Sequence, residues 1–179
     1  MSIAIKMNVN AQEVKPTVRD LDFLLGTWDI TFEIYDTHNP ERGILFKERG
    51  VQHCSFDLEQ NGEPMFITCR GEVTSDKGRT RTFQESIRYG TFVNTFERIG
   101  IFSNWPGTSE ELLYFHSDSR KIEIKGQLKV QDGMLERYED IYSFNEEYTF
   151  YDRRNVANFS DMPVKEFNLT LVGTGRKRN

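Results

Sequence analysis

The chain has 179 residues, a formal net charge of −5 and an aromatic content of 13%. This length predicts a single domain with a hydrophobic core, and the aromatic surplus favours β-structure, where rings pack well on a pleated surface. The charge is spread along the chain without a basic stripe, which excludes the electrostatic pattern of a nucleic-acid-binding protein. Because the sequence has no membrane-length apolar run and no signal-peptide core, we expect a cytoplasmic protein without a membrane partner.

Residues 1–15 show no hydrophobic periodicity, and we expect a flexible N-terminal arm there. A short helix is predicted to begin after Pro16, because Thr17 can cap it and Asp20 stands at the capping-box position. Its leucines share one face and it ends at Gly26. We expect this helix to close one end of the fold.

The segment 28–36 alternates apolar and polar residues without interruption, beginning at Trp28 and including Phe32. A period of two predicts a strand with one dry face and one wet face. Further segments of strand character follow, with turn signals between them: 44–58, 65–73, 79–89, 92–102, 111–117, 121–130, 134–144, 147–151 and 166–175. The chain therefore predicts an all-β fold, a single antiparallel up-and-down β-barrel of about ten strands over residues 16–179.

Asn61-Gly62 is a strong signal for a two-residue hairpin turn. A hairpin centred there pairs several apolar residues on one face and places a proline where no backbone hydrogen bond is needed. The predicted pairs are Cys54 with Cys69, Phe56 with Ile67, Leu58 with Met65, and Glu59 with Pro64.

The two cysteines face each other in this register. A cross-strand disulfide is geometrically possible, but a cytoplasmic setting favours two buried free thiols. Structural zinc needs four ligands, and the chain has only these two cysteines and three isolated histidines. We therefore expect no metal and no cofactor.

Asp132-Gly133 predicts a second hairpin. Its register pairs Lys129 with Glu136 and Lys125 with Asp140 on the outer face, which turns Arg137 and Glu139 inward. A buried charge needs a partner, so an inward Arg137 indicates a polar cavity or an anionic guest whose carboxylate matches the guanidinium. The alternative is that Arg137 and Glu139 neutralise each other or reach water at the rim, because a slip of one residue reverses both faces.

The strand 79–89 supplies a second acid. Phe83, Ile87 and Tyr89 favour its inner face, and the alternation carries Glu85 inward with them. Glu85 is therefore either an acid of the cavity or a charge at the edge.

The segment Gly26-Thr27-Trp28 resembles the calycin group, which includes lipocalins, fatty-acid-binding proteins and nitrobindins. The whole pattern is most similar to bacterial lipocalin-like domains of unknown function, in the opening "LDFLLGTW", the central "IRYGTF…NWPG" and the closing "LVGTG". In lipocalins the tryptophan packs under an arginine near the last strand, and Arg176 is the counterpart here. Nitrobindins bind haem through a histidine on a late strand, but no histidine follows His116.

We therefore predict a lipocalin-like protein that binds a small, mostly apolar and possibly anionic molecule inside the barrel, with a homodimer left open. The alternative is a cofactor-free acid–base enzyme of lyase or isomerase type, acting on a small carboxylate or phenol. In that enzyme Glu85 or Glu139 would exchange a proton with the substrate. A third interpretation is a protein–protein scaffold whose barrel has a solid core. The predicted ligand-binding residues are Arg137, Glu139, Glu85, Tyr89, Phe32 and Trp28.

Overall fold

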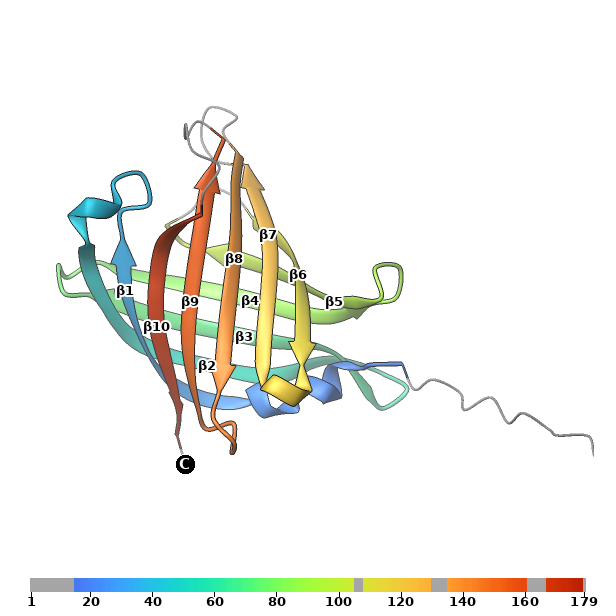
Figure 1. Ribbon diagram of the computed structural model, residues 1–179. Helices are drawn as coiled ribbons and strands as arrows, with labels where there is room; N and C mark the ends of the chain where they lie inside the picture. The colour runs from blue at the N-terminus through green and yellow to red at the C-terminus, as the bar shows by residue number, and fades with distance from the viewer. Residues whose placement is uncertain (1–14, 105–107, 130–134, 161–166, 179) are drawn as a thin grey trace, which may run out of the picture.

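The computed structural model describes residues 15–104, 108–129, 135–160 and 167–178, which form a closed antiparallel barrel of ten strands (Figure 1). Each strand pairs with the next along the chain, and the last closes on the first, so the predicted all-β up-and-down barrel is confirmed. The strands are β1 (Gly26–Tyr35), β2 (Ile44–Gln60), β3 (Glu63–Ser75), β4 (Thr80–Gly90), β5 (Thr95–Phe102), β6 (Thr108–His116), β7 (Lys121–Lys129), β8 (Leu135–Phe144), β9 (Phe150–Phe159) and β10 (Asn168–Lys177).

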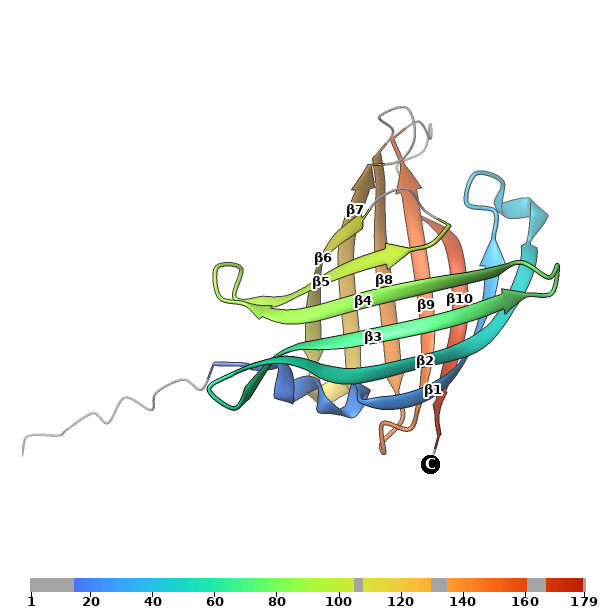
Figure 2. The ribbon, with the colours of Figure 1, turned by 180° about the vertical axis from the view of Figure 1, so that it is seen from behind.

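Three short 3-10 helices complete the described secondary structure, and none of the described helices is long and apolar enough to cross a membrane. They are η1 (Val18–Leu24), η2 (Pro40–Arg42) and η3 (Ser117–Ser119). Figures 1 and 2 show that β2–β5 run steeply across β6–β9 on the opposite wall. The two walls therefore enclose a common interior. Of the predicted arm, residues 1–14 lie outside the described residues.

The helix η1 lies across one end of the barrel, which we call the closed end (Figure 1). It begins as the sequence predicts, because Thr17 and Asp20 form the capping box, with Thr17 N donating to Asp20 Oδ2 at 2.7 Å. Leu21 of this helix is fully buried, and the Phe23 ring centroid lies 5.0 Å from that of Phe115 and 5.1 Å from that of Phe144. Aromatic packing of this kind fills the closed end with side chains.

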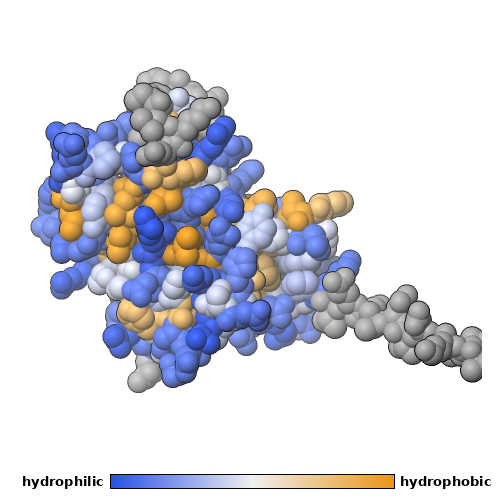
Figure 3. Space-filling view, viewed as in Figure 1, coloured by the Kyte–Doolittle hydropathy of each residue, from blue (hydrophilic) through white to orange (hydrophobic). Residues whose placement is uncertain are grey.

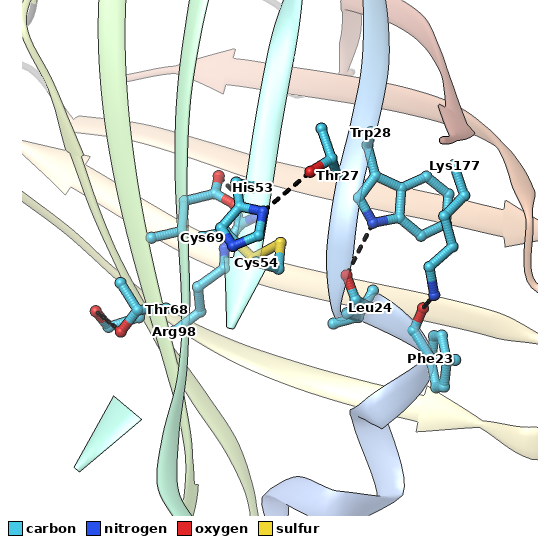
Figure 4. Close-up of a disulfide and its surroundings, with 12 residues drawn as sticks. Phe23, Leu24, Thr27, Trp28, His53, Cys54, Thr68, Cys69, Arg98 and Lys177 are labelled. Atoms are coloured by element: carbon cyan, nitrogen blue, oxygen red, sulfur yellow. Dashed lines mark hydrogen bonds and ion pairs between the residues drawn. A yellow bond between two sulfur atoms is a disulfide. The ribbon is translucent and has the colours of Figure 1, made fainter. Parts of the chain in front are cut away.

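Trp28 is buried at the same end, and its indole Nε1 donates to the Leu24 carbonyl at 2.8 Å (Figure 4). The cation beside it is Lys177, whose Nζ lies 5.5 Å from the ring centroid and donates to the Phe23 carbonyl. The prediction of Arg176 as this cation was wrong, because Trp28 stands opposite Lys177 in the pairing of β1 with β10. Arg176 is exposed and lies over Phe150 instead.

The β2–β3 hairpin confirms three of the four predicted pairs: Cys54 with Cys69, Phe56 with Ile67, and Glu59 with Pro64. The pair of Leu58 with Met65 is missing, because Leu58 takes a left-handed backbone conformation with φ of 51° and drops out of the ladder. Leu58 is 66% exposed and Met65 41% exposed, so the hairpin tip extends beyond the barrel core.

Cys54 and Cys69 are joined in a disulfide, with their Cα atoms 4.0 Å apart (Figure 4). The expectation of two free thiols was therefore wrong, although the face-to-face register on which it depended was right. The bond links β2 to β3 beside the buried wall, where both cysteines are almost inaccessible to water.

The β7–β8 register differs by one residue from the prediction. Lys125 stands opposite Glu139 and Gln127 opposite Arg137, whereas Ile124 stands opposite Asp140. The turn itself, with Asp132-Gly133, lies outside the described residues. Because side chains alternate between faces, this one-residue difference exchanges the inner and outer faces of β8.

Candidate functional site

Arg137 and Glu139 on β8 do not point into the barrel, so the predicted inward orientation was wrong. The observed β7–β8 register differs by one residue from the predicted one and turns both side chains outward. Arg137 is exposed and Glu139 half-buried, and both line a groove of about 660 Å³ on the outer face. The groove also carries Phe66, Ile99 and Phe167. On the face of the molecule that Figure 3 shows, hydrophobic patches lie among hydrophilic residues. Any ligand that Arg137 and Glu139 contact would therefore lie in this groove and not inside the barrel.

The other predicted site residues lie at different levels of the barrel. Glu85 and Phe32 are buried on the inner wall, as predicted, and Trp28 belongs to the closed end. Tyr89 is half-buried against Phe96, and its hydroxyl donates to Asn94 Oδ1 at 2.7 Å beside the β4–β5 turn. Glu85 therefore shares one cavity with Phe32 and the small space beside the disulfide with Trp28, whereas Tyr89 lies apart from both.

Arg98 on β5 is the centre of the interior region around Glu85. Its side chain is buried and donates to two carboxylates, Glu111 through Nε and Glu85 through Nη1, the latter at 3.3 Å. Burial alone would lower the pKa of Arg98, but the charges of Glu111 and Glu85 outweigh it and raise the pKa well above its usual value. Burial would likewise raise the pKa of Glu111, and the adjacent Arg98 lowers it instead. The cluster is therefore a charged one.

Tyr138 on β8 extends this cluster across a glycine. Its hydroxyl donates to Glu111 Oε1, and burial, followed by the charge of Glu111, raises the pKa of the phenol. Gly126 on β7 lies between the two side chains, opposite both Glu111 and Tyr138. A Cβ atom on Gly126 would stand 2.6 Å from Tyr138 Oη and 2.8 Å from Glu111 Cγ, so only glycine leaves room for this contact.

A second buried ion pair lies on β8 and β9. Arg153 Nη2 donates to Asp140 Oδ2 at 2.5 Å and Nε donates to the same carboxylate, while Asp140 is fully buried. The guanidinium also lies 5.3 Å from the Phe32 ring centroid and 4.9 Å from that of Tyr142. Arg98 Nη2 stands 3.8 Å from Asp140 Oδ2, which connects this pair to the Arg98 cluster.

A third interior guanidinium, half-buried, belongs to Arg81 on β4. It forms a two-pronged ion pair with Glu48, with bonds of 2.9 Å from Nε and 2.6 Å from Nη2. Its centre lies 6.0 Å from the ring centroids of both Phe32 and Phe83. Bidentate pairing fixes the orientation of a guanidinium, so Arg81, like Arg153, is held against the aromatic wall.

Two adjoining cavities open among these groups in the half of the barrel away from η1, which we call the mouth half. One has a volume of about 230 Å³ and the other of about 180 Å³. They have four lining residues in common: Arg81, Phe102, Arg153 and Asn155. By contrast, the space beside the disulfide measures only about 40 Å³. The barrel is therefore packed toward its closed end and hollow toward its mouth.

The larger cavity contains a carboxyl group that the sequence-based register had placed outside. Glu136 stands opposite Leu128 and turns inward with Tyr138 and Asp140. Burial raises the pKa of Glu136 from 4.5 to about 7, so the group changes charge near neutral pH. A carboxyl group of this kind is found at ligand and acid–base sites as well as in structural clusters.

Sequence reasoning placed Glu85 and Phe32 in the interior, where they lie, but did not single out Arg98, Glu111, Asp140 and Arg153. A signal for Arg98 and Glu111 exists, because each lies in phase with buried apolar residues, Phe96 on β5 and Leu113 on β6. Among the described residues, no three His, Cys, Asp or Glu side chains come together as metal ligands would.

Comparison with known proteins gave structural likeness alone. No family model matches the chain and no curated protein matches it. A redesigned β-barrel, mFAP0, solved with bound DFHBI, is 15% identical with a TM-score of 0.40, covering 87% of this chain and 99% of the other. The redesigned barrel mFAP1 with DFHBI is 13% identical with a TM-score of 0.38, covering 87% and 96%. At these values the likeness carries no argument about function, and the relation to bacterial lipocalin-like domains stays a prediction.

Proposed function

We propose that the protein binds a small, mostly apolar molecule in the two adjoining cavities of the mouth half. The observation that carries this proposal is a hollow, partly aromatic interior in a barrel whose other end is filled by side chains. Concave sites with apolar walls and a few fixed polar groups are the usual small-molecule sites of proteins. The rings of Phe32, Phe83 and Phe102 would contact the apolar part of the guest.

The anionic group that the sequence predicted for the guest depended on an inward Arg137. The three interior guanidiniums are instead each held by a carboxylate: Arg81 by Glu48, Arg98 by Glu85 and Glu111, and Arg153 by Asp140. An anion would have to compete with these carboxylates for its partner. We therefore keep the apolar part of the prediction and not the anionic part.

The disulfide also bears on the compartment in which the protein works. The disulfide between Cys54 and Cys69 supports an oxidising compartment rather than the cytoplasm that the sequence predicted, because cytosolic thiols are kept reduced. The homodimer stays a prediction.

Filling the cavities from within tests where the guest binds. Asn155→Trp places a large ring where the two cavities meet, so we expect it to weaken binding of the neutral dye N-phenyl-1-naphthylamine at least tenfold. Arg154→Trp adds the same ring to an exposed position of the same strand and is expected to bind the dye like the unsubstituted protein. The measurement is a fluorescence titration of the dye with each protein.

Equal binding by the Asn155→Trp variant would place the dye outside the cavities and contradict the proposed site. A wild-type protein that neither binds the dye nor carries a co-purified guest in native mass spectrometry would contradict the binding function itself. Circular dichroism of both variants establishes that the barrel is intact.

An acid–base enzyme is the second candidate, and Glu136 is the observation that favours it. Glu85 is held by Arg98 and Glu139 lies on the outer face, whereas Glu136 has a pKa of about 7 inside the cavity, as proton transfer near neutrality requires. A co-purified guest that the wild-type protein converts and a Glu136→Gln variant binds unaltered would support the enzyme. A guest that stays unaltered in both proteins would support the binder.

A further inference from the structure

Two polar side chains of the larger cavity are incompletely paired within the described part of the chain. Ser109 is 4% exposed, and its buried Oγ lies beside the Glu111 carboxylate and the Tyr138 hydroxyl without a hydrogen bond of ordinary geometry to either. Glu136 lines the same cavity of about 230 Å³ and makes neither a hydrogen bond nor an ion pair to any described residue. A buried polar group whose hydrogen bonds are incomplete costs free energy, so a guest that completed those of Ser109 and Glu136 would gain from each.

The strand register places these two groups at one level of the barrel. Glu110 on β6 pairs with Gln127, and Leu128, the next residue of β7, pairs with Glu136. Ser109 and Glu136 therefore approach the cavity from either side of Leu128. Each lies two residues along its strand, toward the mouth, from the cross-strand set of Glu111, Gly126 and Tyr138.

The charges that surround this level decide what kind of group fits it. Three guanidiniums and five carboxylates line or brace the interior, and each guanidinium is already engaged by a carboxylate. The groups that face the cavity with Glu136 are Tyr138 and Asp140 on β8, Glu111 on β6, Arg98 on β5, Arg81 on β4 and Arg153 on β9. Glu136 is thus the carboxylate of this set without a cation.

We propose that Ser109 and Glu136 form a subsite for the protonated amine of an otherwise apolar guest, an inference that rests on the proposed binding function. The ammonium group would donate one hydrogen bond to the Glu136 carboxylate and another to Ser109 Oγ. Charge-assisted hydrogen bonds are the stronger kind, and the ion pair would form in a partly dry cavity where it is weakly screened. The apolar part of the guest would lie against Leu128 and Phe102, which line the same space.

Three probes that share one phenyl ring and differ only at the polar end test this subsite: 2-phenylethylamine, 2-phenylethanol and phenylacetate. Calorimetric titration at pH 8, where Glu136 is ionised and the amine protonated, is expected to show the amine binding at least tenfold more tightly than the alcohol or the carboxylate. Glu136→Gln is expected to remove this preference and leave alcohol binding unchanged. Ser109→Ala is expected to weaken amine binding several-fold.

Glu139→Gln is the matched control, because it removes a carboxylate from the outer face of the same strand. The preference for the amine should survive it. Equal or tighter binding of the alcohol or of phenylacetate by the wild-type protein would overturn the amine subsite, as would a preference that persists in a folded Glu136→Gln variant. If none of the three probes binds but the neutral dye does, the amine subsite is refuted and the proposed binding function is retained. If the dye does not bind either, the proposed binding function is refuted as well.

Discussion

Replacement of Arg98 by methionine is expected to lower the free energy of unfolding at pH 7 by about 3–5 kcal/mol, as is usual when one member of a buried ion pair is removed. Methionine keeps much of the side-chain volume but leaves Glu85 and Glu111 buried together without a cation. Urea denaturation followed by tryptophan fluorescence measures the loss. Because the lost stability comes from uncompensated carboxylates, it should shrink as the pH falls and these groups bind protons.

Arg88→Met is the matched control on the neighbouring strand. Arg88 Nε lies 2.7 Å from Glu97 Oε2, but its side chain is 54% exposed, and pairs of this kind contribute at most about 1 kcal/mol. Combining Arg98→Met with Glu85→Gln and Glu111→Gln should recover most of the stability, because the charges are then removed together. Equal losses for Arg98→Met and Arg88→Met would show that the interior cluster is hydrated and not buried.

The barrel could be predicted from the sequence because each strand carries its own evidence. The alternation that begins at Trp28 indicates a strand with one buried face whatever its neighbours are. The Asn61-Gly62 turn then fixes a register over a short distance, and three of its four predicted pairs are observed. The fourth, Leu58 with Met65, fails because the backbone of Leu58 is left-handed, a local feature that alternation does not reveal.

The site was predicted less well because it depends on a register that a single residue can reverse. The turn signal Asp132-Gly133 outweighed the pattern of β8 itself, in which Tyr138, Tyr142 and Phe144 share the inner face with Asp140. The aromatic residues were the better guide to the inner face. Exposing large rings to water forgoes the free energy of burying apolar surface, whereas Arg137 and Glu139 are well solvated outside. This guide would have placed Arg137 and Glu139 outside and Glu136 inside.

The pairing of the interior charges could not have been predicted even with the right faces. Arg98, Glu85 and Glu111 lie on three different strands, and their contact depends on two registers at once: Arg98 stands opposite Glu111, whereas Glu85 stands opposite Gly100. The contact of Tyr138 with Glu111 depends further on the absence of a side chain at Gly126 between them. A charged residue at an inward-facing position of a strand therefore predicts a polar interior, but it does not identify the residue with which that charge pairs.

Glu136→Gln is expected to stabilise the protein at high pH and not at low pH, by up to about 3 kcal/mol at pH 8. The folded protein holds the pKa of Glu136 at about 7, against 4.5 for the ordinary group, because burial disfavours the carboxylate. Below pH 4.5 the group is protonated whether the chain is folded or unfolded, and the variant and the wild type should be equally stable. As the pH rises toward 7 the unfolded chain releases the proton first, so the wild type loses stability that the neutral glutamine does not lose.

The measurement is the difference in unfolding free energy between the Glu136→Gln variant and the wild type, by urea denaturation from pH 4 to pH 8. Taking the difference cancels the titration of the other acids, and Glu139→Gln on the outer face should give a flat difference over the same range. A flat difference for Glu136→Gln as well would mean that water reaches this carboxyl group freely. Saturating 2-phenylethylamine separates the two roles of the group: at one hundred times its dissociation constant it should stabilise the wild type at pH 8 by about 2.7 kcal/mol and the variant far less. The stability of the empty barrel and the affinity for the amine would then report on one and the same unpaired carboxylate.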